Sequence, residues 1–398
     1  MNRKRRVGRI IFFGLISLLV VAIALAVAAF SFGPSFVAKR FNPIAINGTQ
    51  PISEAAQTLH QSLTIADLHA DSLLWGSDLS KPTNYGHVDI PRLIQGNVAL
   101  QVFTVVTKVP APLLLENNDD RSDDITKLAI LQRWSIPAWF SLSERALYQA
   151  KRLKALELNA QGKFKVITSK QDLSNYLAAR QQNIQITAGL LGLEGAHALE
   201  GKIENVDRFY KAGFRLIGLA HFFDNDVSGS AHGIKKGGLT SFGREVLRQM
   251  ESRHMLIDLA HASSRTIDEV LNITNTPILV SHTGVRGTCN NPRNLSDRQI
   301  RQIAQHKGVI GIGFWKTATC GNDATAIAHA IHYVTDLVGV DYVALGSDFD
   351  GAVRLPFDVA DVVQVTNALL AEGFSKQEIT KIMGLNVLNL LQALLPEK

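Results

Sequence analysis

Three ionisable side chains alternate at the end of an apolar run near the start of the chain. In the segment IADLHADSLLW, Asp67, His69 and Asp71 are separated by single residues. Alternate side chains of a β-strand share one face, so these three would converge if the extended conformation continues. Two carboxylates and an imidazole can bind a metal ion, although a polar strand end with a capping role shows the same pattern. Matching residues elsewhere in the chain must decide between the two interpretations.

Five other apolar runs end in a residue of the same chemical kind. The segments GLLGLEG, LIGLAH, LIDLAH, ILVSH and ALGSDFDG supply Glu194, His221, His261, His282 and Asp348. Imidazole together with carboxylate suits zinc or a similar first-row ion. These candidates are too many for one tetrahedral ion, whereas two ions roughly 3.5 to 4 Å apart, sharing a bridging carboxylate, would use them.

The elements that must position these residues are eight strand-like runs separated by segments of helical period. The runs span residues 63–69, 98–106, 186–194, 214–221, 255–261, 277–282, 309–314 and 342–348. Strands alternating with helices predict a parallel sheet, and eight such units predict the α/β class with a (β/α)8 TIM-type barrel. The carboxyl ends of its strands form one rim, which would bring the candidate residues together.

Local signals add detail to this prediction. Capping boxes at Ser296 with Gln299 and at Ser375 with Glu378 indicate helix starts, and residues 52–63 read as an amphipathic lead-in helix. Residues 110–170 would form an insertion of helices and loop between the second and third strands, which could act as a lid.

The N-terminus predicts a membrane segment. Basic residues precede Ile10–Phe32, which carries no charge and is long enough to cross a hydrocarbon core of about 30 Å. We therefore expect residues 1–38 to form a cytoplasmic basic tip and transmembrane anchor, residues 39–51 a connector, and residues 52–398 the barrel domain with the candidate metal ligands, outside the cytoplasm in the periplasm or on the cell surface. The alternative is a cleaved signal peptide, because ALA at 24–26 and AVA at 26–28 resemble cleavage sites.

Composition narrows the remaining classes. The formal charge of +6 includes a basic cluster at the N-terminus, and elsewhere basic residues are interleaved with acids, so no nucleic-acid site is predicted. The two cysteines, Cys289 and Cys320, could pair after export or remain buried free thiols. Because they form no CxxC motif, a zinc ribbon is not expected.

Together these segments resemble the membrane dipeptidase family, also called renal dipeptidases, from about Ser62 to Leu390. The strongest pieces are GLTSFGREVLRQMESRHMLIDLAHAS, SHTGVRGTCNNPRNLSD and GSDFDG. The resemblance implies a zinc peptidase on an amidohydrolase-like barrel, with dipeptides as substrates and a possible homodimer. It also implies a disulfide between the positions of Cys289 and Cys320.

Residue by residue, the resemblance implies two Zn²⁺ ions per chain. His69 and Asp71 would bind one ion, His261 and His282 the other, and Glu194 both. His221 would hold the substrate and its tetrahedral intermediate, Arg293 the terminal carboxylate, and Asp348 the amine and a proton. A water bridging two zinc ions loses a proton near neutral pH, and the resulting hydroxide would attack the carbonyl.

Some positions depart from the family pattern or stay open. Leu68 and Ala70 replace the family's usual intervening residues but should point away from the metals. Trp315 and Lys316 could shape the pocket in place of a tyrosine-bearing stretch. Asp67 and His197 are candidates for orienting metal-bound groups, whereas Asp350, His232 and His254 read as structural or surface residues. Arg286 competes with Arg293 for the carboxylate role.

Two other functions remain open at this stage. Another amide or lactone hydrolase could use the same dizinc barrel, and a surface binding protein could retain the fold without activity. The retained set of candidate ligands argues against the second.

Overall fold

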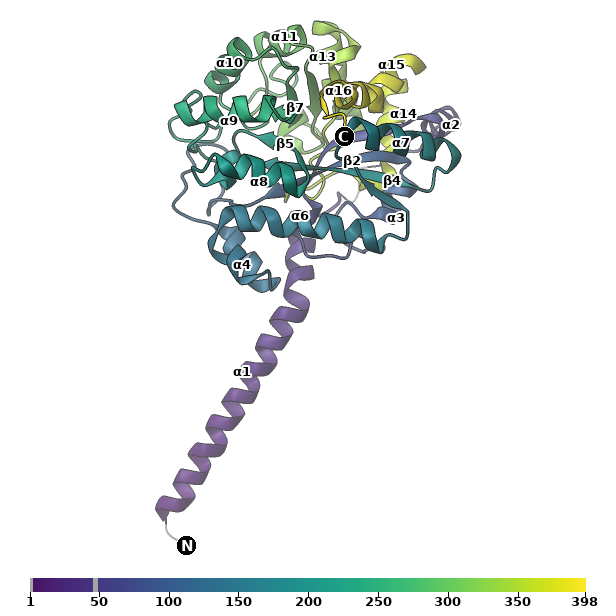
Figure 1. The fold of residues 1–398 in the computed structure, drawn as a ribbon. Helices are drawn as coiled ribbons and strands as arrows, with labels where there is room; N and C mark the ends of the chain where they lie inside the picture. The colour runs from purple at the N-terminus through teal and green to yellow at the C-terminus, as the bar shows by residue number, and fades with distance from the viewer. Residues whose placement is uncertain (1–2, 46–48) are drawn as a thin grey trace.

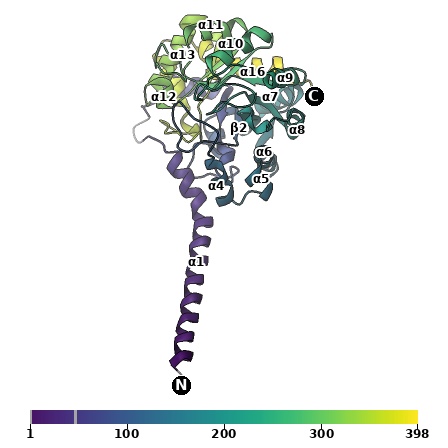
Figure 2. The ribbon, with the colours of Figure 1, turned by 90° about the vertical axis from the view of Figure 1, so that its left-hand side faces the viewer.

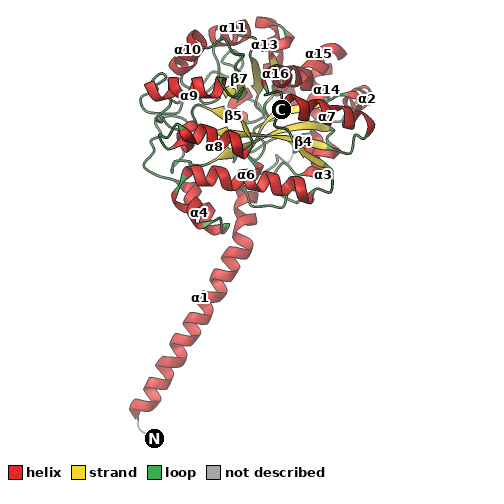
Figure 3. Ribbon diagram, viewed as in Figure 1, coloured by secondary structure: helices red, strands yellow, loops and turns green. Residues whose placement is uncertain are grey.

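The computed structural model describes residues 3–45 and 49–398. A long N-terminal helix, α1 (Arg3–Phe41), projects from a rounded body in which helices surround a sheet (Figures 1 and 3). Part of the expected connector, residues 46–48, lies outside the described residues.

The sheet contains nine parallel strands, eight of which close into a barrel. The closing strands pair in the order β1-β2-β4-β5-β6-β7-β8-β9, and β9 returns to β1. Their bounds are β1 Ile65–Ala70, β2 Val98–Val106, β4 Thr187–Glu194, β5 Phe214–Gly218, β6 Leu256–Asp258, β7 Leu279–Thr283, β8 Val309–Ile312 and β9 Val343–Leu345. The predicted TIM-type barrel is therefore confirmed, and each of these strands overlaps one of the eight expected runs.

The ninth strand was not predicted. β3 (Phe164–Val166) pairs only with the first residues of β4 and lies within the expected insertion. At three residues it is too short to show a period in the sequence.

Helices cover the outside of the barrel (Figure 3). They are α2 Glu54–Ser62, α3 Ile90–Gln95, α4 Asp124–Leu131, α5 Ile136–Phe140, α6 Leu142–Asn159, α7 Lys170–Gln182, α8 Glu204–Ala212, α9 Ser241–Glu251, α10 Ser264–Ile273, α11 Asp297–Gln305, α12 Lys316–Thr319, α13 Ala324–Val338, α14 Val363–Ala371, α15 Lys376–Thr380 and α16 Asn386–Leu394. Both predicted capping boxes are present, at the starts of α11 and α15.

The eight strands of the closed barrel are buried on both faces, which explains their nearly continuous apolar sequences. All six residues of β1 are buried, and Leu68 belongs to an apolar cluster that includes Val387 and Leu391 of α16. Leu68 and Ala70 thus pack in the hydrophobic core, as expected for side chains that alternate with His69. The alternation leaves Asp67 and His69 free to face other partners.

A disulfide joins Cys289 to Cys320, so the interpretation as free thiols is wrong. Cys289 follows β7 and Cys320 follows β8 and the short helix α12. The bond therefore ties together two loops at the carboxyl ends of neighbouring strands.

The start of the barrel domain depends on a buried histidine in α2. His60 places Nδ1 2.8 Å from the Thr366 hydroxyl and Nε2 3.0 Å from the Gly96 carbonyl oxygen, so it links α2 to α14 and to the end of α3. Burial lowers the pKa of His60 to about 4. The folded protein therefore keeps this ring neutral at pH values where the unfolded chain would protonate it.

Replacing His60 by glutamine should make the protein less sensitive to acid. The buried, neutral His60 ring contributes fully to the free energy of unfolding above its ordinary pKa of 6.5. This contribution is lost as the pH falls toward 4. Between pH 7 and pH 5 the wild type should lose about 2 kcal/mol more unfolding free energy than His60→Gln. Urea unfolding of the full chain in mild detergent at both pH values measures this difference, and equal losses would contradict it.

Candidate metal centre and substrate pocket

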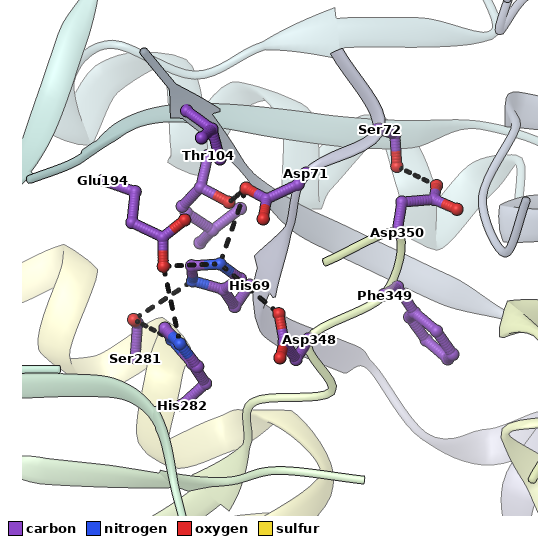
Figure 4. Close-up of polar contacts among 12 residues, drawn as sticks. His69, Asp71, Ser72, Thr104, Glu194, Ser281, His282, Asp348, Phe349 and Asp350 are labelled. Atoms are coloured by element: carbon purple, nitrogen blue, oxygen red, sulfur yellow. Dashed lines mark hydrogen bonds and ion pairs between the residues drawn. The ribbon is translucent and has the colours of Figure 1, made fainter. Parts of the chain in front are cut away.

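Glu194, the last residue of β4, lies at the centre of a buried histidine cluster. Its Oε1 is 3.1 Å from His261 Nε2 and 3.5 Å from the Nε2 atoms of His69 and His282. Its Oε2 is 3.4 Å from His221 Nε2. The structure therefore brings together residues from five strand ends that the sequence separates by more than two hundred positions. Figure 4 shows His69, Glu194 and His282 of this group.

A second group of side chains meets His69 from the other side. Its Nε2 lies 3.6 Å from Asp71 Oδ1 and 3.9 Å from Asp348 Oδ1. Figure 4 shows His69 between Glu194 and these two carboxylates. His69 is thus the meeting point of the acidic residues expected at the rim.

His261 and Asp348 lie on sharp backbone turns that direct their side chains into the cluster. His261 and Asp348 follow the last residues of β6 and β9 by three positions and have φ angles of 61° and 63°. This left-handed conformation is costly for residues other than glycine and often occurs at functional sites. The predicted strands thus end earlier than expected, and the ligand candidates stand on the turns that follow.

The crowded charges shift the pKa values of the cluster. Burial raises the pKa of Glu194 well above its usual value and raises that of Asp348 to about 8. Burial opposes the charged form of His69, but Glu194 and Asp71 outweigh it and raise its pKa to about 10. Glu194, Asp71 and Asp348 are thus buried close together, and additional positive charge between them would stabilise their ionised forms.

The donor set fits a bound cation. Three groups of possible ligand atoms each lie within 4.8 Å of one another, namely His69 with Glu194 and His282, Glu194 with His221 and His261, and His69 with Asp71 and Asp348. Among the described residues, His69 Nε2 and Glu194 Oε2 are buried without a hydrogen-bond partner. The Nε2 atoms of His261 and His282 approach to 2.8 Å, and two facing imidazole nitrogens of this kind can both bind a metal.

Ser281 and Asp258 support the cluster from below, and sequence reasoning missed both. The Ser281 hydroxyl donates to Asp258 Oδ2 at 2.6 Å and lies 3.2 Å from His69 Nδ1 and 3.0 Å from His282 Nδ1. One serine therefore contacts the far sides of two histidines that face Glu194 (Figure 4). The signal was available, since Asp258 is the acid in LIDLAH and Ser281 precedes the histidine in ILVSH.

Two further buried contacts position acidic members of the site. Asp67 accepts hydrogen bonds from the Ser347 backbone and hydroxyl at 2.8 and 2.7 Å, and so holds the turn that carries Asp348. Thr104 of β2 donates to Asp71 Oδ1 at 2.7 Å. Asp67 thus faces away from the cluster and acts on its scaffold.

The cluster forms the floor of a pocket of about 320 Å³. Its walls include Trp75, Phe222 and Trp315, and the consecutive leucines 113–115 of the insertion contribute to the mouth. Such a volume, mainly apolar with a few convergent polar groups, suits a small ligand.

Arg293 lies in this pocket, whereas its competitor Arg286 does not line it. Arg293 is buried, donates to the His282 carbonyl oxygen at 2.7 Å, and lies 5.9 Å from the centre of the Trp315 ring. Arg286 donates instead to the Asn294 carbonyl oxygen at 2.9 Å. Only Arg293 is placed to meet a ligand above the cluster.

The remaining candidates fall outside the cluster. His197 bonds Thr107 at 3.0 Å and stacks behind His221, with 6.4 Å between ring centres. Asp350 accepts from Ser72 at 2.6 Å and is structural. Lys316 begins α12 and does not line the pocket.

His254 and His232, which were both expected to be structural or surface residues, have different surroundings. His254 is exposed, as expected. His232 is buried, lines the pocket and places Nδ1 2.7 Å from the Leu115 carbonyl oxygen, so of the two expected roles, structural or surface, its burial excludes the surface one. The preceding Ala231 pairs with His261 through backbone atoms, a long-range contact that no local pattern reveals.

Known proteins are similar to this chain in sequence or in fold. A protein described only as "uncharacterized protein in pqqA 5'region" from Klebsiella pneumoniae is 30% identical over 256 residues, covering 60% of this chain and 92% of that protein. Dipeptidase tcpJ of Claviceps purpurea is 27% identical over 317 residues, covering 77% of this chain and 69% of that protein.

A metallopeptidase from Rhodobacter sphaeroides, solved with a phosphinate mimic of the dipeptide L-Ala-D-Ala, superposes with a TM-score of 0.69 at 22% identity, covering 83% of this chain and 99% of that one. A crystal structure described as the metallopeptidase dipeptidase AC gives a TM-score of 0.71 at 22% identity over 84% of this chain and 99% of that one. The sequence model of the membrane dipeptidase family, peptidase family M19, matches residues 53–395. The chain therefore belongs to the membrane dipeptidase family of metallopeptidases.

Proposed function

We propose that the protein is a membrane-anchored dipeptidase that holds two zinc ions and hydrolyses the peptide bond of dipeptides with a free carboxylate. The observation that carries this proposal is the placement of Glu194 among four histidines in the same pocket as Arg293. The apolar segment of α1 supports the anchor.

In this proposal His69 and Asp71 hold one ion, His261 and His282 hold the other, and Glu194 binds both. When bound, two such ions acidify a water molecule and polarise the scissile carbonyl. The closeness of His221 to Glu194 and His261, and of Asp348 to His69 and Asp71, leaves these two residues beside the reacting atoms.

Three residues would then bind the substrate carboxylate, stabilise the developing negative charge and transfer the proton. The guanidinium of Arg293 is a planar fork that pairs with a carboxylate through two hydrogen bonds, which selects substrates with a free C-terminus. His221 donates a hydrogen bond to the oxygen on which negative charge develops. Asp348 accepts a proton and delivers it to the leaving amine.

The walls of the pocket favour apolar side chains on the substrate. Trp75, Phe222 and the leucines 113–115 offer no charge to a dipeptide side chain. The polar groups lie on the floor, where they would meet the backbone of the dipeptide. We infer that the backbone and terminal charges determine recognition more than the side-chain chemistry does.

Removing the metal should abolish hydrolysis. Because the proposed nucleophile depends on bound ions, a chelator should stop turnover of a panel of L,L and L,D dipeptides by the full chain in detergent, and added zinc should restore it. Elemental analysis of the purified protein should give close to two zinc per chain. Turnover that resists the chelator, or protein without metal, would reject the mechanism; the latter result would favour a binding protein.

Replacing Arg293 by alanine should lower kcat/KM for dipeptides about 10- to 150-fold, since hydrogen bonds between charged partners contribute about 1.5–3 kcal/mol. Arg293→Lys should restore only part of the loss, because an ammonium cannot bind the carboxylate as a fork. Arg286→Ala is the matched control and should change little.

The same variants distinguish a dipeptidase from another hydrolase. The wild type should prefer a dipeptide acid over its C-terminal amide, and Arg293→Ala should lose this preference. An unchanged preference would favour the alternative of a different amide or a lactone as substrate.

Replacing Ser281 by alanine should weaken binding of both ions. The Ser281 hydroxyl donates its single proton to Asp258, so its lone pairs accept from the Nδ1–H groups of His69 and His282 and leave both Nε2 atoms free for metal. Loss of such an orienting partner typically costs 10- to 100-fold in metal affinity. Competition with a zinc-binding dye measures both affinities.

Thr104→Val is the matched control for Ser281→Ala. Thr104 contacts Asp71, on the His69 side of the site. Thr104→Val should therefore lower the affinity for one of the two ions only. Unchanged affinities for both ions in Ser281→Ala would show that Ser281 does not position the ligands.

A further inference from the structure

The last turns of α1 are part of the folded body. Ala38 is completely buried, and Val37 packs against the apolar cluster that contains Ile125, Leu128 and Trp134. Besides Ala38, its buried members come from α4, the residues after it and α5, together with Leu74, Trp75 and Val106. Both views show α4 beside the end of α1 nearest the body (Figures 1 and 2).

The contacts between α1 and α4 reach down to the apolar segment itself. The side chain of Leu131 lies so close to Gly33 that a Cβ there would be 3.0 Å from Leu131 Cδ1. The guanidinium of Arg133 lies 5.3 Å from the centre of the Phe30 ring. Because the apolar segment Ile10–Phe32 ends beside these contacts, the end of α4 lies level with the end of that segment.

The helix that follows α4 carries exposed apolar side chains. Ile136 is 65% exposed and Phe140 83% exposed. They are four residues apart in α5 and therefore lie on the same face of the helix. Ile130, near the end of α4, is 39% exposed.

Single exposed apolar residues are common and need no explanation. Here, however, they lie next to a helix that can cross a membrane, and Arg133 lies between Ile130 and Ile136 in the sequence. Apolar side chains with a neighbouring cation are typical of segments that rest in the interface of a bilayer.

We propose that α5 and the end of α4 form a second membrane contact, in which Ile130, Ile136 and Phe140 enter the headgroup region of the bilayer that α1 spans. This inference rests on the anchor in the proposed function. It goes beyond the anchor because it proposes that α5 and the end of α4, which belong to the folded domain, also contact the lipid surface.

The second contact would also set the position of the pocket. Phe41 at the end of α1 stacks on Trp75, with ring centres 6.1 Å apart, and Asn42 accepts a hydrogen bond from the Ala352 backbone at 3.0 Å. Trp75 and Ala352 both line the pocket. Two contacts with the bilayer, one through α1 and one through α5, would hold this mouth at a fixed height and orientation beside the membrane.

Fluorescent labels on single cysteines test the contact in the full chain. The native cysteines are paired in a disulfide, so Phe140→Cys and Ile136→Cys can be labelled selectively with an environment-sensitive dye. Ile273→Cys is the control; Ile273 is 48% exposed at the end of α10, at the opposite pole from α1 (Figure 2). The labelled proteins are placed in nanodiscs of phosphatidylcholine and phosphatidylglycerol.

We expect labels at 140 and 136 to shift to shorter emission wavelengths and to be quenched by lipids carrying a nitroxide near the headgroup. Iodide in the water should quench them several-fold less than the label at 273. Equal iodide quenching at all three positions would overturn the proposed contact.

A label at Leu18→Cys, in the middle of the apolar segment of α1, separates this proposal from the anchor. Quenching at residue 18 by nitroxides deep in the acyl chains, without headgroup quenching at 140 or 136, would leave the anchor intact and reject the second contact. No quenching at residue 18 would reject the anchor and with it the contact of α5.

Discussion

The burial of Glu194 among histidines is the constraint on which the rest of the site depends. A carboxylate taken out of water is costly unless it is paired, and this one is only 6% exposed. Its nearest partners are imidazoles whose outer nitrogens are already turned toward Ser281 or have no partner among the described residues. Cations bound between these groups would compensate this charge, which is why the pocket makes better chemical sense as a metal centre than as a network of protein hydrogen bonds.

The closed barrel makes such a cluster possible, because it brings strand ends to one rim while apolar side chains fill the space below. Directly under the rim, buried polar residues connect neighbouring strands: Asp258 at the end of β6 holds Ser281 of β7, and Asp67 of β1 holds Ser347 after β9. Ser281 in turn contacts His69 and His282, and Ser347 immediately precedes Asp348. We expect these contacts to hold the candidate ligands rigidly, because any displacement of Ser281 would move both His69 and His282.

Much of the fold and the membership of the site could be predicted from the sequence, because both leave periodic signals. Apolar strands that end in histidine or acid mark the rim, and the alternation separates His69 and Asp71, which meet in the cluster, from Leu68 in the core, whereas Asp67 binds the scaffold residue Ser347. The rest depends on contacts between distant segments. His232 joins the pocket through long-range contacts such as its neighbour's pairing with His261 and its own bond to Leu115, and β3 is too short to show a period.

The mouth of the pocket is held differently on its two sides, and this bears on how substrate reaches the site. On one side, the disulfide ties the loop that carries Arg293 to the loop that carries Trp315, and the Arg293 guanidinium lies over the Trp315 ring. On the other side, Trp75 and Ala352 contact the end of α1. The leucines 113–115 have neither restraint; hydrogen bonds with Asn118 and His232 hold their backbone, while their side chains are nearly half exposed. Of the walls described, these side chains can therefore turn aside most easily when a dipeptide enters, while Arg293 and the histidine floor stay in place.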